Sequence, residues 1–198
     1  MKEIVVISGK GGTGKTSITA SFAYYGAGDV VIADCDVDAA DMHLILKPKT
    51  IHSEDFYSGL TAQINSDDCT RCGICAGVCR FGAISFDDKY SINNLNCEGC
   101  GYCNIVCPVK AIDMNERKVG IWSVGTTLLG NVLVHAKLGI GSENSGKLVA
   151  KVKNEAKKIA VEKNKQFVIV DGSPGIGCPV VSSLSGADFV VFVTESTV

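Results

Sequence analysis

The sequence predicts an α/β protein with a mostly parallel, doubly wound sheet that is interrupted by a small α+β insert. Short apolar runs alternate with helical patterns towards both ends of the chain, and a glycine-rich loop joins the first run to the first helix. The middle of the chain holds eight of the ten cysteines. Unbroken apolar runs are typical of strands buried on both faces, and their alternation with helices indicates a parallel sheet.

The expected elements lie on either side of the cysteine-rich segment. The apolar runs that predict strands are Ile4–Ile7, Val30–Ala33, Phe167–Val170 and Phe189–Val193. Helical patterns are found at Lys15–Tyr25 and Lys147–Asn164, where apolar residues recur at helical spacing. We therefore expect one α/β domain over residues 1–62 and 119–198, with an inserted domain over residues 63–118.

Composition narrows the classes of partner and the compartment. The chain has 198 residues and a formal net charge of −2, with acidic and basic residues interspersed, so we expect no nucleic-acid partner. No apolar stretch approaches the ~18 residues of a membrane span, and the N-terminal residues do not resemble a signal peptide. We therefore expect a cytoplasmic protein with no membrane partner. Cysteines in that reducing compartment predict metal ligation rather than disulfides.

The cysteine-rich segment is an internal repeat. Each copy has the spacing C-x2-C-x2-C-x3-C, and the second copy follows the first at a constant offset of 28 residues, as from Cys69 to Cys97. A repeat this short cannot bury a core of its own, but two copies closed around metal clusters can. Zinc sites are typically built from two Cys-x2-Cys pairs that are well separated in the sequence, whereas here four cysteines lie within eleven residues in each copy, which favours iron-sulfur cubanes.

This segment resembles the two-cluster 4Fe-4S ferredoxins of bacteria over its whole length. In that family three close cysteines bind one cluster and the fourth binds the other. The resemblance implies one cluster held by Cys69, Cys72, Cys75 and Cys107, and a second held by Cys97, Cys100, Cys103 and Cys79. Pro108 follows the last cysteine of the second copy as the family pattern requires, whereas Arg80 replaces the proline after Cys79. A cation is therefore expected close to one cluster.

The glycine-rich loop has the pattern of a phosphate-binding P-loop, Gly9-x4-Gly14-Lys15-Thr16, between a strand and a helix. Backbone N–H groups would face the phosphates, Lys15 would reach the β- and γ-phosphate oxygens, and the Thr16 hydroxyl would bind Mg²⁺. The residues expected to bind the nucleotide are Gly9, Gly11, Gly12, Thr13, Gly14, Lys15, Thr16 and Ser17. A second stretch, Gly141-x4-Gly146-Lys147, continues with Leu148 and lacks the metal-binding hydroxyl, so we expect only a loop in which Asn144 or Ser145 caps the next helix.

The form KGGTGKT, with Lys10 early in the loop, resembles the deviant P-loop of the MinD/ParA/iron-protein superfamily. The resemblance covers residues 1–60 and 119–198, and it implies ATP as the nucleotide and an ATP-dependent homodimer. It also implies that Lys10 reaches the phosphates of the partner subunit and stabilises charge in the transition state. Members of this superfamily continue beyond the strand equivalent to 189–193, so we expect a shortened or unusually short member.

Carboxylates at the ends of two other strands complete the expected site. In the family, the Asp-x-Asp motif at Asp34 and Asp36 and the strand end at Asp171 lie near the metal and the attacking water. The resemblance assigns Asp36 to the water and Asp34 and Asp171 to the Mg²⁺ shell. Gly175 would sense the γ-phosphate through its backbone N–H. The expected catalytic residues are thus Lys10, Lys15 and Asp36.

The combination resembles MinD-superfamily ATPases that carry an inserted ferredoxin domain. Two functions remain open: nucleotide-gated electron transfer to a redox partner, as in the nitrogenase iron protein, or assembly and delivery of a metal cofactor to a protein partner, as in ATPases of the Mrp/Nbp and CooC types. Two complete sets of four cysteines leave no open ligand position, which favours electron transfer. Cys178 and Cys35 would have to supply a shared labile cluster in the second function, but small buried thiols are the simpler interpretation.

Overall fold

The computed structural model describes residues 1–139, 141 and 145–195. The chain divides into two compact units, one formed by residues 1–56 and 119–198 and the other by residues 57–118. The predicted start of the insert, residue 63, lies inside strand β3 (Lys49–Ile64), which runs from the first unit into the second. Strand β6 (Ile112–Thr126) returns the chain from the second unit to the first.

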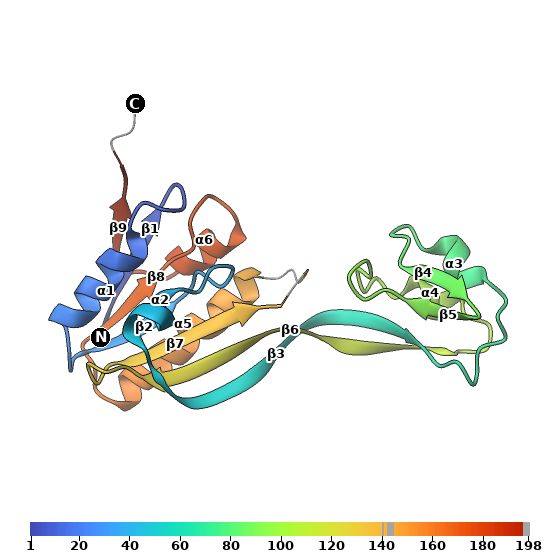
Figure 1. The fold of residues 1–198 in the computed structure, drawn as a ribbon, viewed down its shortest axis with the longest axis horizontal. Coiled ribbons are helices and arrows are strands. Elements are labelled where there is room, and N and C mark those ends of the chain that lie inside the picture. Colours follow the sequence, from blue (N-terminus) through green and yellow to red (C-terminus); the bar gives the residue numbers. More distant parts are fainter. Residues whose placement is uncertain (140, 142–144, 196–198) are drawn as a thin grey trace. The chain divides into compact units, whose positions relative to one another are not determined.

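The first unit is built on a seven-stranded sheet with the order β3-β6-β7-β2-β8-β1-β9 (Figure 1). Its other strands are β1 (Lys2–Ser8), β2 (Val30–Asp34), β7 (Val132–Leu138), β8 (Phe167–Asp171) and β9 (Phe189–Val193). In this spatial order, adjacent strands of the run β7-β2-β8-β1-β9 pair in parallel, whereas β6 pairs with β7 in the antiparallel direction. The predicted fold class, a mostly parallel sheet with an α+β insert, is confirmed.

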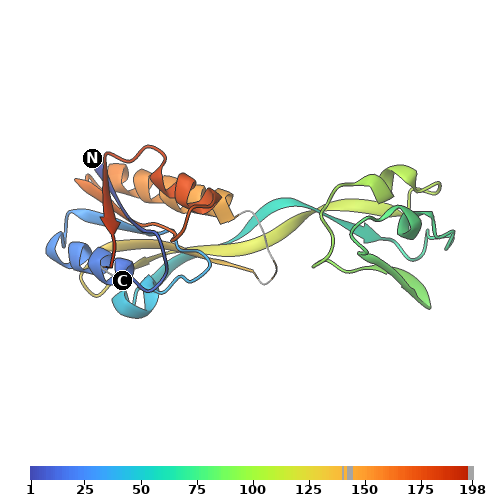
Figure 2. The same ribbon diagram turned by 90° about the horizontal axis from the view of Figure 1, so that it is seen from above.

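Helices cover both faces of this sheet. They are α1 (Lys15–Tyr25), α2 (Met42–Leu46), α5 (Ser145–Glu162) and α6 (Cys178–Leu184). Figure 2 shows α1 and α2 on one side of the sheet and α5 and α6 on the other. Because side chains alternate along a strand, Val31 of β2 packs in the core with α5, whereas Ile32 packs with α1 and α2.

The second unit has its own small core. Helices α3 (Ile74–Val78) and α4 (Tyr102–Val106) accompany a two-stranded antiparallel sheet of β4 (Ile84–Asp87) and β5 (Lys89–Ile92). The residues at the centre of this core are Ala62, Cys75, Ala83, Cys97 and Ile112. Cysteines thus form part of the core itself, which is the arrangement expected when bound clusters replace apolar side chains.

The sheet register brings three strand ends together. Asp171 at the end of β8 is opposite Asp34 at the end of β2 and opposite Val6 near the end of β1. The carboxyl ends of parallel strands are where α/β proteins place their ligand-binding loops. The loops that follow β1, β2 and β8 therefore meet at one edge of the sheet.

Within the described part of the chain, no helix is long and apolar enough to cross a membrane.

Candidate functional site

The loop between β1 and α1 is shaped by two glycines in the left-handed region. Gly12 and Gly14 both have φ of 83°, and a Cβ atom built on either would have no neighbour within 4 Å. The requirement for glycine is therefore one of backbone conformation. Gly14 directly precedes α1 and accepts a hydrogen bond from the backbone N–H of Ile18 (3.0 Å), so the free N–H groups of the first helical turn lie beside the loop.

A cavity of about 670 Å³ lies at this edge of the sheet. It is lined by Ser8, Gly11, Gly12, Thr13, Gly14, Lys15, Thr16, Ser17, Asp36, Asp38, Ala39, Asp41, Ser173, Pro174, Gly177 and Pro179. The cavity thus combines the phosphate-loop residues with the loops after β2 and β8. Its size and its position at a helix N-terminus suit a phosphorylated ligand.

Lys15 lines the cavity and links the loop after β1 to carboxylates just after β2 and at the end of β8. Its Nζ lies 3.0 Å from Oδ1 of Asp171 and 3.4 Å from Oδ2 of Asp36, and its side chain is almost fully buried. Thr19, one helical turn after Lys15, donates its hydroxyl to the same Asp171 oxygen (3.2 Å). The other oxygen of Asp171, Oδ2, is buried without a hydrogen-bond partner. A buried carboxylate oxygen without a donor is the feature expected where a metal-bound water would sit.

The two carboxylates of the Asp-x-Asp motif have different surroundings. Asp34 is fully buried, and its two oxygens accept the backbone N–H groups of Asp36 and Met42, each at 3.2 Å. Burial, followed by the charge of Asp171, raises the pKa of Asp34 well above its usual value. Burial also raises the pKa of Asp36, while the ammonium of Lys15 opposes that increase. Asp34 therefore holds the loop in place, and Asp36 presents its carboxyl group to the cavity.

Five of the residues predicted for the nucleotide site do not line the cavity: Gly9, Lys10, Asp34, Asp171 and Gly175. Lys10 is half exposed, and its Nζ forms an ion pair with Glu195 at 3.0 Å. The backbone N–H of Gly175, expected to face a γ-phosphate, donates to the carbonyl of Ser8 (3.1 Å). That hydrogen bond ties the loop after β8 to the end of β1.

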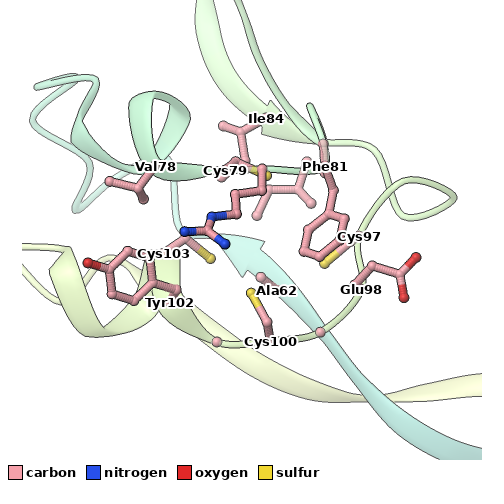
Figure 3. Close-up of a pocket in the computed structure, with 15 residues that line it drawn as sticks. Ala62, Val78, Cys79, Phe81, Ile84, Cys97, Glu98, Cys100, Tyr102 and Cys103 are labelled. Carbon is pink, nitrogen blue, oxygen red and sulfur yellow. The ribbon is translucent and has the colours of Figure 1, made fainter.

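The second unit contains two cavities lined by cysteines. The larger, about 450 Å³, is lined by Ala62, Val78, Cys79, Arg80, Phe81, Ala83, Ile84, Ile92, Cys97, Glu98, Gly99, Cys100, Gly101, Tyr102 and Cys103. In Figure 3 the sulfurs of its cysteines surround a common space. The smaller, about 20 Å³, is lined by Ile64, Cys69, Thr70, Cys72, Gly73, Ile74, Cys75, Tyr90, Cys107, Pro108, Val109, Ala111 and Ile112. Each cavity therefore has three cysteines of one sequence repeat and the last cysteine of the other.

The chemistry of the cysteine cavities fits iron-sulfur clusters. None of the ten cysteines is in a disulfide bond, and burial raises the pKa of the Cys75 and Cys103 thiols, so metal binding at these positions must displace a proton. Among the described residues, no three His, Cys, Asp or Glu side chains converge as a single ion would require. A cubane binds its cysteines through separate iron atoms and so holds them further apart than one zinc ion does.

The backbone next to Cys100 also requires a glycine. Gly99 has φ of 65°, and a Cβ atom at this position would lie 2.2 Å from the carbonyl oxygen of Leu60. The loop that carries Cys97 and Cys100 therefore packs directly on the backbone of β3. Only glycine fits there, because any side chain would have to displace that strand.

Sequence reasoning missed two residues that contact the candidate sites. Thr19 lies one turn after Lys15 on the same helix face, so its contact with Asp171 follows from helical spacing once Lys15 is placed. Arg117 donates from Nη1 to the backbone carbonyl of Cys97 (3.1 Å). These two residues are twenty apart in the sequence, and no spacing rule predicts their contact.

Comparison with known proteins identifies a family for the inserted segment. Residues 62–114 match the family described as the 4Fe-4S dicluster domain. Among solved structures, the chain is similar to the septum site-determining protein MinD with Mg-ADP from Pyrococcus horikoshii OT3 (18% identity, TM-score 0.42) and to the cell division ATPase MinD of Pyrococcus furiosus (19% identity, TM-score 0.42). The alignments cover 98% of this chain but 57% and 59% of those chains.

Sequence relatives are found in Methanocaldococcus jannaschii. The chain is 28% identical to the uncharacterized protein MJ0579 over 209 residues, covering 100% of this chain and 70% of that protein. It is 39% identical to the uncharacterized protein MJ0578 over 197 residues, covering 98% of this chain and 68% of that protein. The predicted combination of a P-loop α/β domain with an inserted dicluster domain is confirmed, and the chain belongs to the same family as MJ0578.

Proposed function

We propose that the chain is an ATP-hydrolysing iron-sulfur protein of the MinD type that couples nucleotide-dependent dimerisation to electron transfer through two 4Fe-4S clusters. The observation that carries the proposal is the presence, in one chain, of a phosphate-loop cavity and of two cavities that each contain a complete set of four cysteines.

The nucleotide cavity supports the ATPase half of the proposal. When ATP binds, the ammonium of Lys15 would exchange its ion pairs with Asp36 and Asp171 for contacts with the β- and γ-phosphates. Asp36, released from that ion pair and with a raised pKa, would orient and deprotonate the attacking water. Mg²⁺ would be held by the hydroxyl of Thr16 and, through its water shell, by Asp171, whose Oδ2 lacks a protein partner. Asp34 would support this arrangement from below.

The cysteine cavities support the electron-transfer half. Cys69, Cys72, Cys75 and Cys107 would hold one cluster, and Cys97, Cys100, Cys103 and Cys79 the other. Each bound cluster supplies one-electron redox chemistry. The protein would contribute four thiolates per site and a wall that is largely apolar, with Arg80 and Glu98 as the charged residues at one of the two cavities. Because no ligand position stays open, the sites suit retained clusters better than clusters that are handed on.

The alternative is a cofactor-assembly ATPase with a labile cluster between subunits, for which Cys35 and Cys178 would be needed. Cys178 is exposed, but Cys35 is completely buried, and burial raises its pKa well above the usual value. A thiol in that position is a poor metal ligand. The burial of Cys35 therefore weighs against a shared site of four cysteines.

The test uses anaerobically purified protein. We expect about eight iron and eight sulfide per chain, MgATP hydrolysis, and a rate of electron transfer from the reduced protein to an artificial acceptor that differs between the ADP- and ATP-bound forms. Lys15→Gln should abolish that difference while leaving the iron content unchanged. Equal transfer rates in the apo, ADP and ATP forms would contradict coupling. A third cluster bound between two subunits would favour the assembly function.

A further inference from the structure

The two cysteine cavities are made from equivalent positions of the sequence repeat, so their differences can be read position by position. At the offset of 28 residues, the four cysteines of one cavity are equivalent to the four of the other. One glycine, one alanine and two isoleucines of each cavity are also equivalent. The equivalent lining residues that differ are Arg80 and Pro108, Phe81 and Val109, Glu98 and Thr70, and Tyr102 and Ile74. Charged side chains therefore occur in the wall of one cavity only.

Two guanidinium groups lie at that charged cavity. Arg80 directly follows Cys79 and lines the cavity. Arg117 of β6 donates to the backbone carbonyl of Cys97 at 3.1 Å, so its positive charge is also close to a cysteine of the same set. A positive charge beside a redox centre stabilises the reduced state, which carries one more negative charge.

Three other features oppose this asymmetry. Arg71 directly precedes Cys72 of the other site, but it does not line the cavity there. Glu98 lines the cavity of Cys97 and Cys100 with a negative charge, but Figure 3 shows its carboxylate directed away from the cysteine sulfurs. At the other cavity, the backbone N–H of Ala111 donates to the sulfur of Cys107 (3.3 Å), which also favours a reduced centre. A neutral dipole contributes less than the full charge of a guanidinium group.

We infer that the two cluster sites are inequivalent and that the site formed by Cys79, Cys97, Cys100 and Cys103 receives the first electron, because Arg80 and Arg117 stabilise the added charge there. The inference rests on the proposed function, since it requires that both cavities hold clusters. The step is a single-electron reduction: the electron comes in the test from the SO2•⁻ radical anion, which forms when the S–S bond of dithionite breaks and which is oxidised to sulfite, and no bond of the protein is formed or broken. The second site is reduced only at lower potential.

An anaerobic redox titration of the full chain, followed by electron paramagnetic resonance, tests the inference. The wild type should show two midpoint potentials. Arg80→Gln should lower the higher midpoint potential by up to about 59 mV, which corresponds to a tenfold change in the equilibrium constant of a one-electron reduction. Pro108→Arg should raise the lower one. Lys89→Gln, which removes an exposed charge of the same unit that lines neither cavity, should change neither.

Ligand variants assign the two potentials to the two sites. Cys100→Ser should alter the higher-potential signal, and Cys72→Ser, at the equivalent position of the other repeat, the lower one. One common midpoint in the wild type, or a larger shift for Glu98→Gln than for Arg80→Gln, would overturn the inference and leave the proposed function intact. Protein that binds no iron after reconstitution would instead contradict the proposed function.

Discussion

At the scale of single residues, Lys15 joins the phosphate loop to the carboxylates on which hydrolysis would depend. Its buried ammonium contacts Asp171 and Asp36, so in this structure its single positive charge is shared between two acids at the floor of the cavity. A phosphate chain would compete for the same ammonium. On the proposed function, nucleotide binding would therefore change the charge balance around Asp36 as well as fill the cavity.

Lys15→Gln should weaken MgATP binding by roughly 10- to 100-fold, because it removes a hydrogen bond between charged groups. Isothermal titration calorimetry measures the change. The matched control is Lys147→Gln, since Lys147 also follows a Gly-x4-Gly stretch but precedes Leu148 and lies outside the cavity. Equal affinities of the two variants would contradict the assignment of the phosphate loop.

His135 provides a pH-dependent contribution to stability. Its ring is stacked on that of His43 with centroids 5.5 Å apart, and burial, followed by the neighbouring His43, lowers its pKa below 6.5. The folded state then binds fewer protons than the unfolded state, so this contribution is present above pH 6.5 and is lost as the pH falls through the lowered pKa.

His135→Gln should therefore be less sensitive to acid than the wild type. We expect the free energy of unfolding of the wild type, relative to the variant, to fall as the pH decreases from above 6.5 through the lowered pKa of His135. Anaerobic guanidinium denaturation followed by far-UV circular dichroism measures it. A difference that is constant over this range would show that His135 titrates alike in both states.

The sequence predicts those parts of the candidate sites whose residues lie close together along the chain. The phosphate loop and the cysteine repeat each concentrate their residues within a few positions, and both stretches line cavities in the structure. The roles of these residues stay predictions. The contact of Arg117 with Cys97 was not predictable in this way, because it depends on where β6 passes the cysteine loop.

At the scale of elements, α5 carries a buried cation that its apolar pattern does not reveal. Lys153 is 3% exposed, its Nζ lies 2.8 Å from Glu3 Oε1, and it donates to the backbone carbonyls of Ser183 and Ser185 near the end of α6. Lys157 pairs with the other Glu3 oxygen at 2.6 Å. This network joins β1, α5 and α6.

Lys153→Met should destabilise the first unit by about 3 kcal/mol, because Glu3 stays buried with one partner fewer and the carbonyls of α6 lose their donor. Thermal or chemical unfolding of the full chain measures the loss. Lys158→Met, an exposed substitution on the same helix, should change stability by less than ~0.5 kcal/mol. Similar losses for the two variants would show that the network contributes nothing specific.

The apolar runs and helical patterns predicted the strands β1, β2, β8 and β9 and the helices α1 and α5, but not the buried strand β7. The helix Lys15–Tyr25 and the strand Phe189–Val193 have the expected bounds. Strand β3 was not predicted, because most of its side chains are exposed and its sequence has neither an apolar run nor regular alternation. Its position depends on backbone pairing with β6, which pattern reasoning on one segment does not detect.

At the scale of the whole molecule, the proposal requires two copies of the chain around the nucleotides. Lys10 is the residue whose predicted contact would lie in the partner subunit, and here it forms an ion pair with Glu195 of its own chain. Both side chains are partly exposed, so the pair is weak and can be exchanged for a phosphate group.

We expect a non-hydrolysable MgATP analogue to convert the monomer into a dimer, as measured by analytical ultracentrifugation. Lys10→Ala should lower the dimer fraction and the hydrolysis rate, while Glu195→Gln, which frees Lys10, should leave both at or above the wild-type level. Dimerisation of Lys10→Ala equal to that of the wild type would exclude a contribution of Lys10 across the interface.

The exchange of the last cysteines between the two repeats makes the halves of the insert dependent on each other. Cys79 belongs to the first repeat but lines the cavity of the second, and Cys107 does the reverse. Damage by oxygen at one centre would therefore release a chain segment that also anchors its neighbour. Oxidative decay of either centre should accelerate the loss of iron from the other.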